Sequence, residues 1–94
     1  MKIPKKIKIG GHIYKVILRA RAKEDGVGSC GTCDSQYGKM WIESSWIRSQ
    51  QESTLIHEII EAINWNYKLE LEEGQIQGLE AGLYQTLKDN RLLK

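Results

Sequence analysis

Alternation of apolar and polar residues predicts a β-hairpin near the start of the chain. In residues 6–20, KIKIGGHIYKVILRA, two stretches rich in β-branched residues flank Gly10 and Gly11. Glycines tolerate the positive φ angles that a two-residue hairpin loop requires. The implied register pairs three residues of the first strand with three of the second, namely Ile9 with His12, Ile7 with Tyr14 and Lys6 with Lys15.

The predicted hairpin has one apolar face and one basic face. Because side chains alternate across a strand, we expect five residues to cover the core together: Ile7, Ile9, Tyr14, Val16 and Leu18. The opposite face carries four cations, Lys6, Lys8, Lys15 and Arg19. Like charges on opposed residues are mildly unfavourable, so we expect this face to lie in solvent or to meet an anionic partner.

The next part of the chain predicts a loop and a second hairpin. Residues 19–29, RARAKEDGVGS, are polar and contain glycines, which is typical of a flexible loop. Residues 30–44, CGTCDSQYGKMWIES, predict a hairpin that turns near Tyr37 and Gly38. Its returning strand would consist of Met40, Trp41 and Ile42.

From residue 45 onward the apolar spacing changes to that of a helix. Ser49 and Glu52 form an S-x-x-E capping box, which predicts the start of the helix. Helical spacing predicts a buried stripe of Ile56, Ile59, Ile60, Ile63 and Tyr67. A second helix is predicted from about Gln75 to Asp89, with an inner stripe of Ile76, Leu79, Leu83 and Leu87.

The order of strands followed by helices predicts an α+β fold. We expect a small antiparallel sheet of two β-hairpins with two packed helices on one face. The 94 residues are enough for a single domain, residues 1–94. No apolar run reaches the roughly 18 residues of a membrane helix, and the basic N-terminus lacks the apolar region of a signal peptide. The expected location is the cytoplasm, with no membrane partner.

Charge is distributed unevenly along the chain. Eight of the 14 Lys and Arg residues lie within residues 1–23, whereas all 12 acidic residues follow that segment. Such asymmetry indicates either a basic face for an anionic partner such as nucleic acid, or two halves that attract each other in the folded state. Both interpretations stay open at the level of the sequence.

The segment HEIIE, residues 57–61, places ionisable groups inside an apolar helical stretch. His57 and Glu61 are four residues apart, about 6 Å along a helix axis and about 40° out of register, so both can reach one ion. Glu58 lies beside them, where it can act on water as a general base. In the second helix, Glu80 is a candidate third ligand, and Tyr84 follows on the same face, where a phenol can stabilise an oxyanion.

These motifs resemble those of small phage and prophage proteins of the minimal zincin type. The resemblance rests on KIKIGGHIYKV, STLIHEIIEAIN and LEAGLYQTLKDN and extends over nearly the whole chain. It implies zinc bound through the helix motif, with His57 and Glu61 as ligands, Glu58 as general base and Glu80 as third ligand. It also implies a bacterial host cell and a peptide or protein substrate. The departure from the fuller motif is Glu61, where zincins have His.

The histidine and two carboxylates make a nearly neutral zinc site. Such a site polarises water less than one with two histidines, and its oxygen ligands also suit Mn²⁺ or Fe²⁺. Two classes of function follow: a metal-dependent hydrolase of the peptidase kind, or a non-enzymatic module that binds nucleic acid or protein through Lys6, Lys8, Lys15 and Arg19. An inactive zincin relative fits the same motif.

Cys30 and Cys33 form a C-x-x-C in a glycine-rich turn. No second C-x-x-C is present to complete a structural zinc site, and a strand-to-helix setting typical of redox motifs is missing. Structural thiols and a metal or redox role are both compatible with this pattern.

Overall fold

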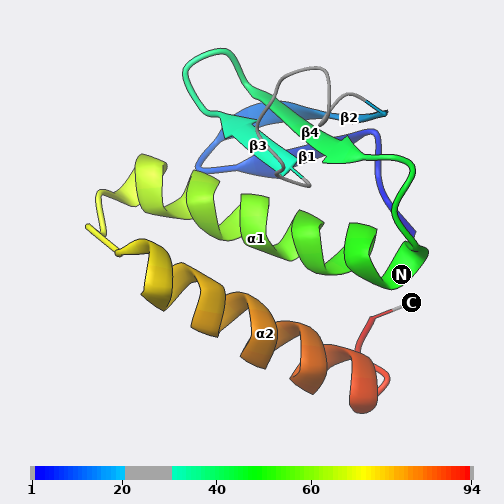
Figure 1. Cartoon of the computed structure of the whole chain (residues 1–94). Helices are drawn as coiled ribbons and strands as arrows, with labels where there is room; N and C mark the ends of the chain where they lie inside the picture. Colours follow the sequence, from blue (N-terminus) through cyan, green and yellow to red (C-terminus); the bar gives the residue numbers. More distant parts are fainter. Residues whose placement is uncertain (1, 21–30, 94) are drawn as a thin grey trace.

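The computed structural model describes residues 2–20 and 31–93 of the chain. In these two ranges, four strands precede two helices: β1 (Lys6–Ile9), β2 (His12–Arg19), β3 (Gly31–Asp34), β4 (Lys39–Glu43), α1 (Arg48–Tyr67) and α2 (Glu73–Asp89). Figure 1 shows three layers, with the sheet on one side, α1 in the middle and α2 on the outside. The α+β fold expected from the sequence is therefore confirmed. Of the predicted loop at residues 19–29, residues 21–29 lie outside the described residues.

The sheet is mixed, with strand order β1-β2-β4-β3. The first hairpin has the predicted register, with Ile9 opposite His12 and Lys6 opposite Lys15. The second hairpin pairs β3 with β4 in antiparallel fashion. The two hairpins meet through β2 and β4, which are parallel, so the expectation of a wholly antiparallel sheet was wrong. Alternating patterns define each hairpin but do not specify which of its edges faces the other hairpin.

The main core lies between the inner face of the sheet and α1. Its buried residues come from both layers: Ile9, Tyr14, Val16, Met40, Ile42, Leu55 and Ala62. Of the predicted inner face of the first hairpin, Ile9, Tyr14 and Val16 are buried, but Leu18 remains 45% exposed. The paired part of β1 ends at Lys6, opposite Lys15, so the far end of β2 has no neighbouring β1 residue to help cover Leu18.

Helix α1 begins at Arg48, with Ile47 as the N-cap residue and no side-chain capping bond. The predicted capping box was therefore wrong: Ser49 lies inside the first turn. Glu52 is 2% exposed and accepts hydrogen bonds from Tyr84 and Lys88 of α2. The sequence pattern could not distinguish a capping carboxylate from one that is buried in a contact between helices.

Because α1 is the middle layer, it is buried on two sides. Leu55 and Ala62 belong to the core under the sheet, whereas Ile56 and Ile60 pack with Ile76 of α2. Tyr67, predicted to be buried, is 61% exposed. At this end Asn66 turns toward the sheet instead, and its Nδ2 donates to the hydroxyl of Tyr14 at 2.8 Å.

Helix α2 packs on α1 alone among the described elements. It begins at Glu73, and a capping box between Glu72 and Gln75 fixes this end. Ile76 is buried as predicted, but Leu79 and Leu83 are more than two-fifths exposed. The face that contacts α1 instead contains Tyr84 next to Ile76. None of the helices in the described ranges is long and apolar enough to cross a membrane.

Candidate metal centre

The middle of α1 brings its ionisable side chains to the boundary with α2. His57 and Glu61 are one helical turn apart, and Glu73 of α2 joins them. One potential ligand atom from each of the three residues lies within 4.8 Å of the others. Ligands of a single zinc ion lie about 2.0–2.2 Å from it, so the three side chains would have to close slightly around one ion to bind it.

Glu73 is the member of this group that the sequence analysis missed. Its Oε1 lies 3.4 Å from Nε2 of His57, and its side chain is 60% exposed. Glu73 and Glu80 are seven residues apart, so they share one face of α2. Spacing along the helix therefore fitted either residue as the third ligand. Only the position of α2 relative to α1 distinguishes them.

Glu80 lies on the other nitrogen of the same ring. Its Oε1 is 2.8 Å from Nδ1 of His57, and its second oxygen accepts a hydrogen bond from the hydroxyl of Ser53. When Nδ1 of a neutral imidazole donates to a carboxylate, Nε2 keeps its lone pair and the ring is held in place. Glu80 thus directs Nε2 of His57 toward Glu73 and Glu61.

Glu58 is the buried acid of the cluster, with an exposure of 4%. Burial is the main cause that raises the pKa of its carboxyl from 4.5 to about 7, and neighbouring carboxylates such as Glu61 raise it further. His57 acts in the opposite direction. The Glu58 side chain therefore interacts electrostatically with the three candidate ligands, and the neighbouring carboxylates disfavour a negative charge on Glu58 itself.

His57 lies among four acidic side chains, which come from both α1 and α2. Burial of the ring lowers its pKa, but the hydrogen bond to Glu80 and the charges of Glu58 and Glu73 outweigh burial and raise the pKa above 6.5. One imidazole thus faces four carboxyl groups. This excess of negative charge favours either a proton on His57 or a cation between the side chains.

Tyr84, which the sequence placed over the substrate position, has a different partner. Its hydroxyl donates to Oε1 of Glu52 at 2.6 Å, and Nζ of Lys88 donates to the same oxygen at 2.8 Å. The structure thus places Tyr84 with Glu52, near the start of α1, and not with the group of His57, Glu61 and Glu73.

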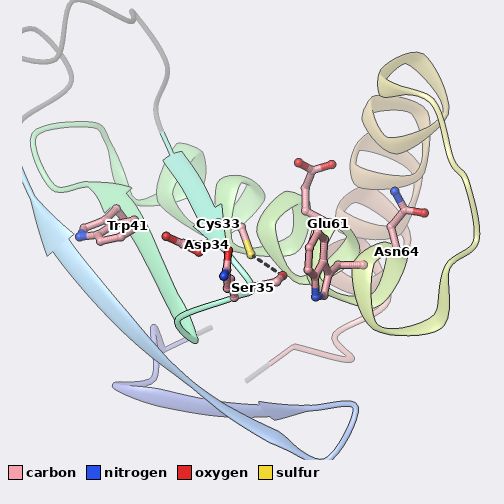
Figure 2. Close-up of a pocket in the computed structure, with 8 residues that line it drawn as sticks. Cys33, Asp34, Ser35, Trp41, Glu61 and Asn64 are labelled. Carbon is pink, nitrogen blue, oxygen red and sulfur yellow. Dashed lines mark hydrogen bonds between the residues drawn. The ribbon is translucent and has the colours of Figure 1, made fainter.

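A cleft of about 510 Å³ adjoins the candidate ligands at Glu61. Figure 2 shows Cys33 and Asp34 of β3 on one side of this cleft and Glu61 and Asn64 of α1 on the other. Its volume lies within the range of about 300–1,000 Å³ that is typical of small-molecule sites. The cleft therefore offers space for a ligand directly beside Glu61.

Cys33 lies half-buried in the wall of this cleft. Its Sγ is 3.6 Å from the hydroxyl oxygen of Ser35, as the dashed line in Figure 2 marks. Burial is the main cause that raises the pKa of the thiol from 9.0 to about 11. Cys33 is therefore a thiol, not a thiolate, at neutral pH; Cys30 lies outside the described residues.

Comparisons of the chain with protein-family models, with curated proteins and with solved structures gave no match. The zincin resemblance therefore stays a prediction that rests on the motifs themselves.

Proposed function

We propose that this domain binds one divalent metal ion through His57, Glu61 and Glu73, and that it is a metal-dependent hydrolase of peptide or other amide bonds. The observation that carries the proposal is the approach of one nitrogen and two carboxylate oxygens to within 4.8 Å of one another across the α1–α2 boundary. Zinc accepts this donor set, and Mn²⁺ and Fe²⁺ tolerate it.

The electrostatics of the cluster support a cation at this place. Four carboxyl groups lie around His57, and the most buried of them, Glu58, has a raised pKa because of its surroundings. Burial of an ionised carboxylate without a counter-charge is costly, and the group raises its pKa in response. A divalent ion would offset that cost and would account for the buried Glu58 beside the half-buried His57 and Glu61.

Each residue has a distinct part in the proposed reaction. His57, Glu61 and Glu73 hold the ion, and a bound ion would supply Lewis acidity toward a carbonyl oxygen. Glu80 keeps Nδ1 of His57 engaged so that Nε2 stays free. Glu58 takes the proton of the attacking water and passes it to the leaving amine. The substrate would lie in the cleft beside Glu61.

Metal content tests the first half of the proposal. Protein purified without added metal or chelator should contain about one divalent ion per chain by elemental analysis, and His57→Ala and Glu73→Gln should each lose it. Glu70→Gln is the matched control, because Glu70 is an exposed acid in the connection between the helices. Loss of the ion in Glu80→Gln but not in Glu73→Gln would assign the third ligand to Glu80 instead.

Activity tests the second half. Glu58→Gln should keep its metal and lose about 10²–10⁴ in the rate of hydrolysis of whichever peptide or amide the native protein cleaves in a broad screen. A native protein that holds the ion and cleaves nothing would reduce the proposal to a metal-binding domain without hydrolase activity.

A further inference from the structure

The outer face of the sheet, opposite the helices, carries a row of lysines. Both helices lie on one side of the sheet (Figure 1). Lys6 of β1 pairs with Lys15 of β2, and Lys15 pairs with Lys39 of β4. All three are exposed, as expected from the sequence for Lys6 and Lys15. Lys39 joins them only because β2 and β4 are parallel neighbours.

This lysine row is electrostatically unfavourable in isolation. Adjacent strands are about 4.8 Å apart, so three ammonium groups emerge from neighbouring positions, and Lys8 adds a fourth along β1. Asp34 of β3 is opposite Lys39 in the register of the sheet, but within residues 2–20 and 31–93 no acidic side chain lies within ion-pair distance of these four lysines. Like charges in register on a sheet destabilise it, and an anionic partner would reverse that effect.

Aromatic surface lies beside the lysine row. The guanidinium of Arg19 lies 5.0 Å from the ring centroid of Trp41, in a cation–π arrangement. Trp41 follows Lys39 by two positions on β4 and therefore shares its face. At the other side of the row, Ile13 is 63% exposed and Tyr37, in the β3–β4 turn, is 70% exposed. The face thus combines charges for phosphate with flat surfaces for bases.

We propose that this outer face, defined by Lys6, Lys8, Lys15, Lys39, Arg19 and Trp41, binds single-stranded nucleic acid. Lysines neutralise phosphates, and aromatic and guanidinium planes stack with unpaired bases. The face is a flat sheet with no protruding helix, so it does not present an element that enters the major groove of a duplex. The lysines of this surface lie on the face of the sheet away from the helices, whereas Trp41 also lines the cleft beside Glu61.

Fluorescence anisotropy of a labelled 20-nucleotide single strand, with the full chain, tests the proposal. The double variant Lys15→Gln/Lys39→Gln should weaken binding at least tenfold at low salt. Its plot of log affinity against log salt should flatten by about 1.4, since each neutralised phosphate contributes about 0.7 for single strands. Lys68→Gln/Arg91→Gln removes the same charge from exposed positions on the helical side and should bind like the native protein.

Trp41→Leu separates stacking from charge. It should weaken binding about tenfold without changing the salt dependence, because base stacking is not a counterion effect. If Lys15→Gln/Lys39→Gln and Lys68→Gln/Arg91→Gln lost the same binding affinity, the proposal would be overturned, because the loss would then reflect net charge alone. Equal affinity for a duplex of the same length would also overturn it, as would binding to vesicles of anionic phospholipid in the absence of binding to the single strand.

Discussion

Glu80 is separated from the candidate ligand atoms by the imidazole ring of His57. Its carboxylate bonds Nδ1 of His57 on one side and the hydroxyl of Ser53 on the other. The residue therefore favours a proton on Nδ1 of His57, and it does so from the side of the ring opposite Glu73. The effect of such an outer partner on metal affinity is typically 10–100-fold.

Glu80→Gln should weaken divalent-metal binding by about 10–100-fold while leaving the fold intact. In the metal-free variant the pKa of His57 should fall, because the hydrogen bond to Glu80 and its charge both raise that pKa in the native protein. Isothermal titration calorimetry measures the first effect, and NMR titration of the His57 ring measures the second. An unchanged pKa would mean that Glu80 does not control the protonation of His57.

The buried carboxyl of Glu52 should make the stability of the fold depend on pH. Burial raises the pKa of this carboxyl, but the hydrogen bonds from Lys88 and Tyr84 outweigh burial and lower the pKa from 4.5 to about 2. A lowered pKa contributes stability that is fully present above the unfolded value and is lost as the pH falls through the folded value. The loss should therefore occur between about pH 4.5 and pH 2.

Tyr84→Phe should lower the free energy of unfolding at pH 7 by about 1.5–3 kcal/mol, because it removes a hydrogen bond to a buried charged carboxylate. Urea denaturation measured from pH 7 to pH 2 tests both the loss of stability in acid and the effect of Tyr84→Phe. Below pH 4.5, the free energy of unfolding should fall less steeply with decreasing pH in Tyr84→Phe than in the native protein. Tyr67→Phe is the matched control, since the Tyr67 side chain is 61% exposed, and it should behave like the native protein.

At the scale of elements, α2 depends on a narrow contact. Within the described part of the chain, Ile76 is its one buried residue, and it packs between Ile56 and Ile60 of α1. Tyr84 packs against the same apolar cluster. The polar links from α2 to α1 are those of Glu73 and Glu80 to His57, and those of Tyr84 and Lys88 to Glu52. The position of Glu73, the candidate third ligand, therefore depends on a small apolar contact and several charged ones.

Ile76→Ala should lower the free energy of unfolding by about 2–5 kcal/mol, the usual range for an isoleucine truncated in a core. It should also weaken metal binding, because Glu73 is then less firmly placed beside His57. Leu79→Ala, at a position 44% exposed on the same helix, should cost less than about 1 kcal/mol and leave metal binding intact. Equal effects of the two variants would contradict the packing of α2 described above.

At the level of elements, sequence patterns predicted local structure better than they predicted how distant elements pack together. The glycine pair and the alternation of residues 6–20 sufficed for the register of the first hairpin, because both are local properties of the chain. The parallel contact of β2 with β4 and the burial of Glu52 depend on how elements meet, and periodicity does not encode that. Leu79 and Leu83 fit a helical stripe, yet both are more than two-fifths exposed, since α2 packs against a single helix.

The same limit applied to the candidate site. His57, Glu58 and Glu61 were found because a fixed spacing on one helix fixes their geometry. Glu73 was missed because it and Glu80 share a face of α2, and the rotation and shift of α2 against α1 decided between them. Tyr84 was assigned to this site by its spacing from Glu80, but the packing of the helices gave its hydroxyl to Glu52.

At the scale of the whole molecule, the lysine row and the acids around His57 lie on different sides of the sheet. The sheet presents Lys6, Lys15 and Lys39 away from the helices, and the helical side carries the acids around His57. The uneven charge along the sequence thus becomes an uneven charge across the fold. Of the two interpretations that the sequence left open, a separate basic face fits this arrangement better for these lysines, because they form no ion pair with an acid among the described residues.

The middle position of α1 has a consequence for how the chain is made. A ribosome releases strands β1 to β4 before it releases α1, residues 48–67, so the apolar inner face of the sheet leaves the ribosome before the helix that covers it. Nascent chains of this length carry exposed β edges and an uncovered apolar surface, which are the features that chaperones recognise and that promote aggregation. Folding of this protein is therefore expected to begin only when α1 has left the exit tunnel, and a pause in translation before that point is the moment at which the chain is most vulnerable.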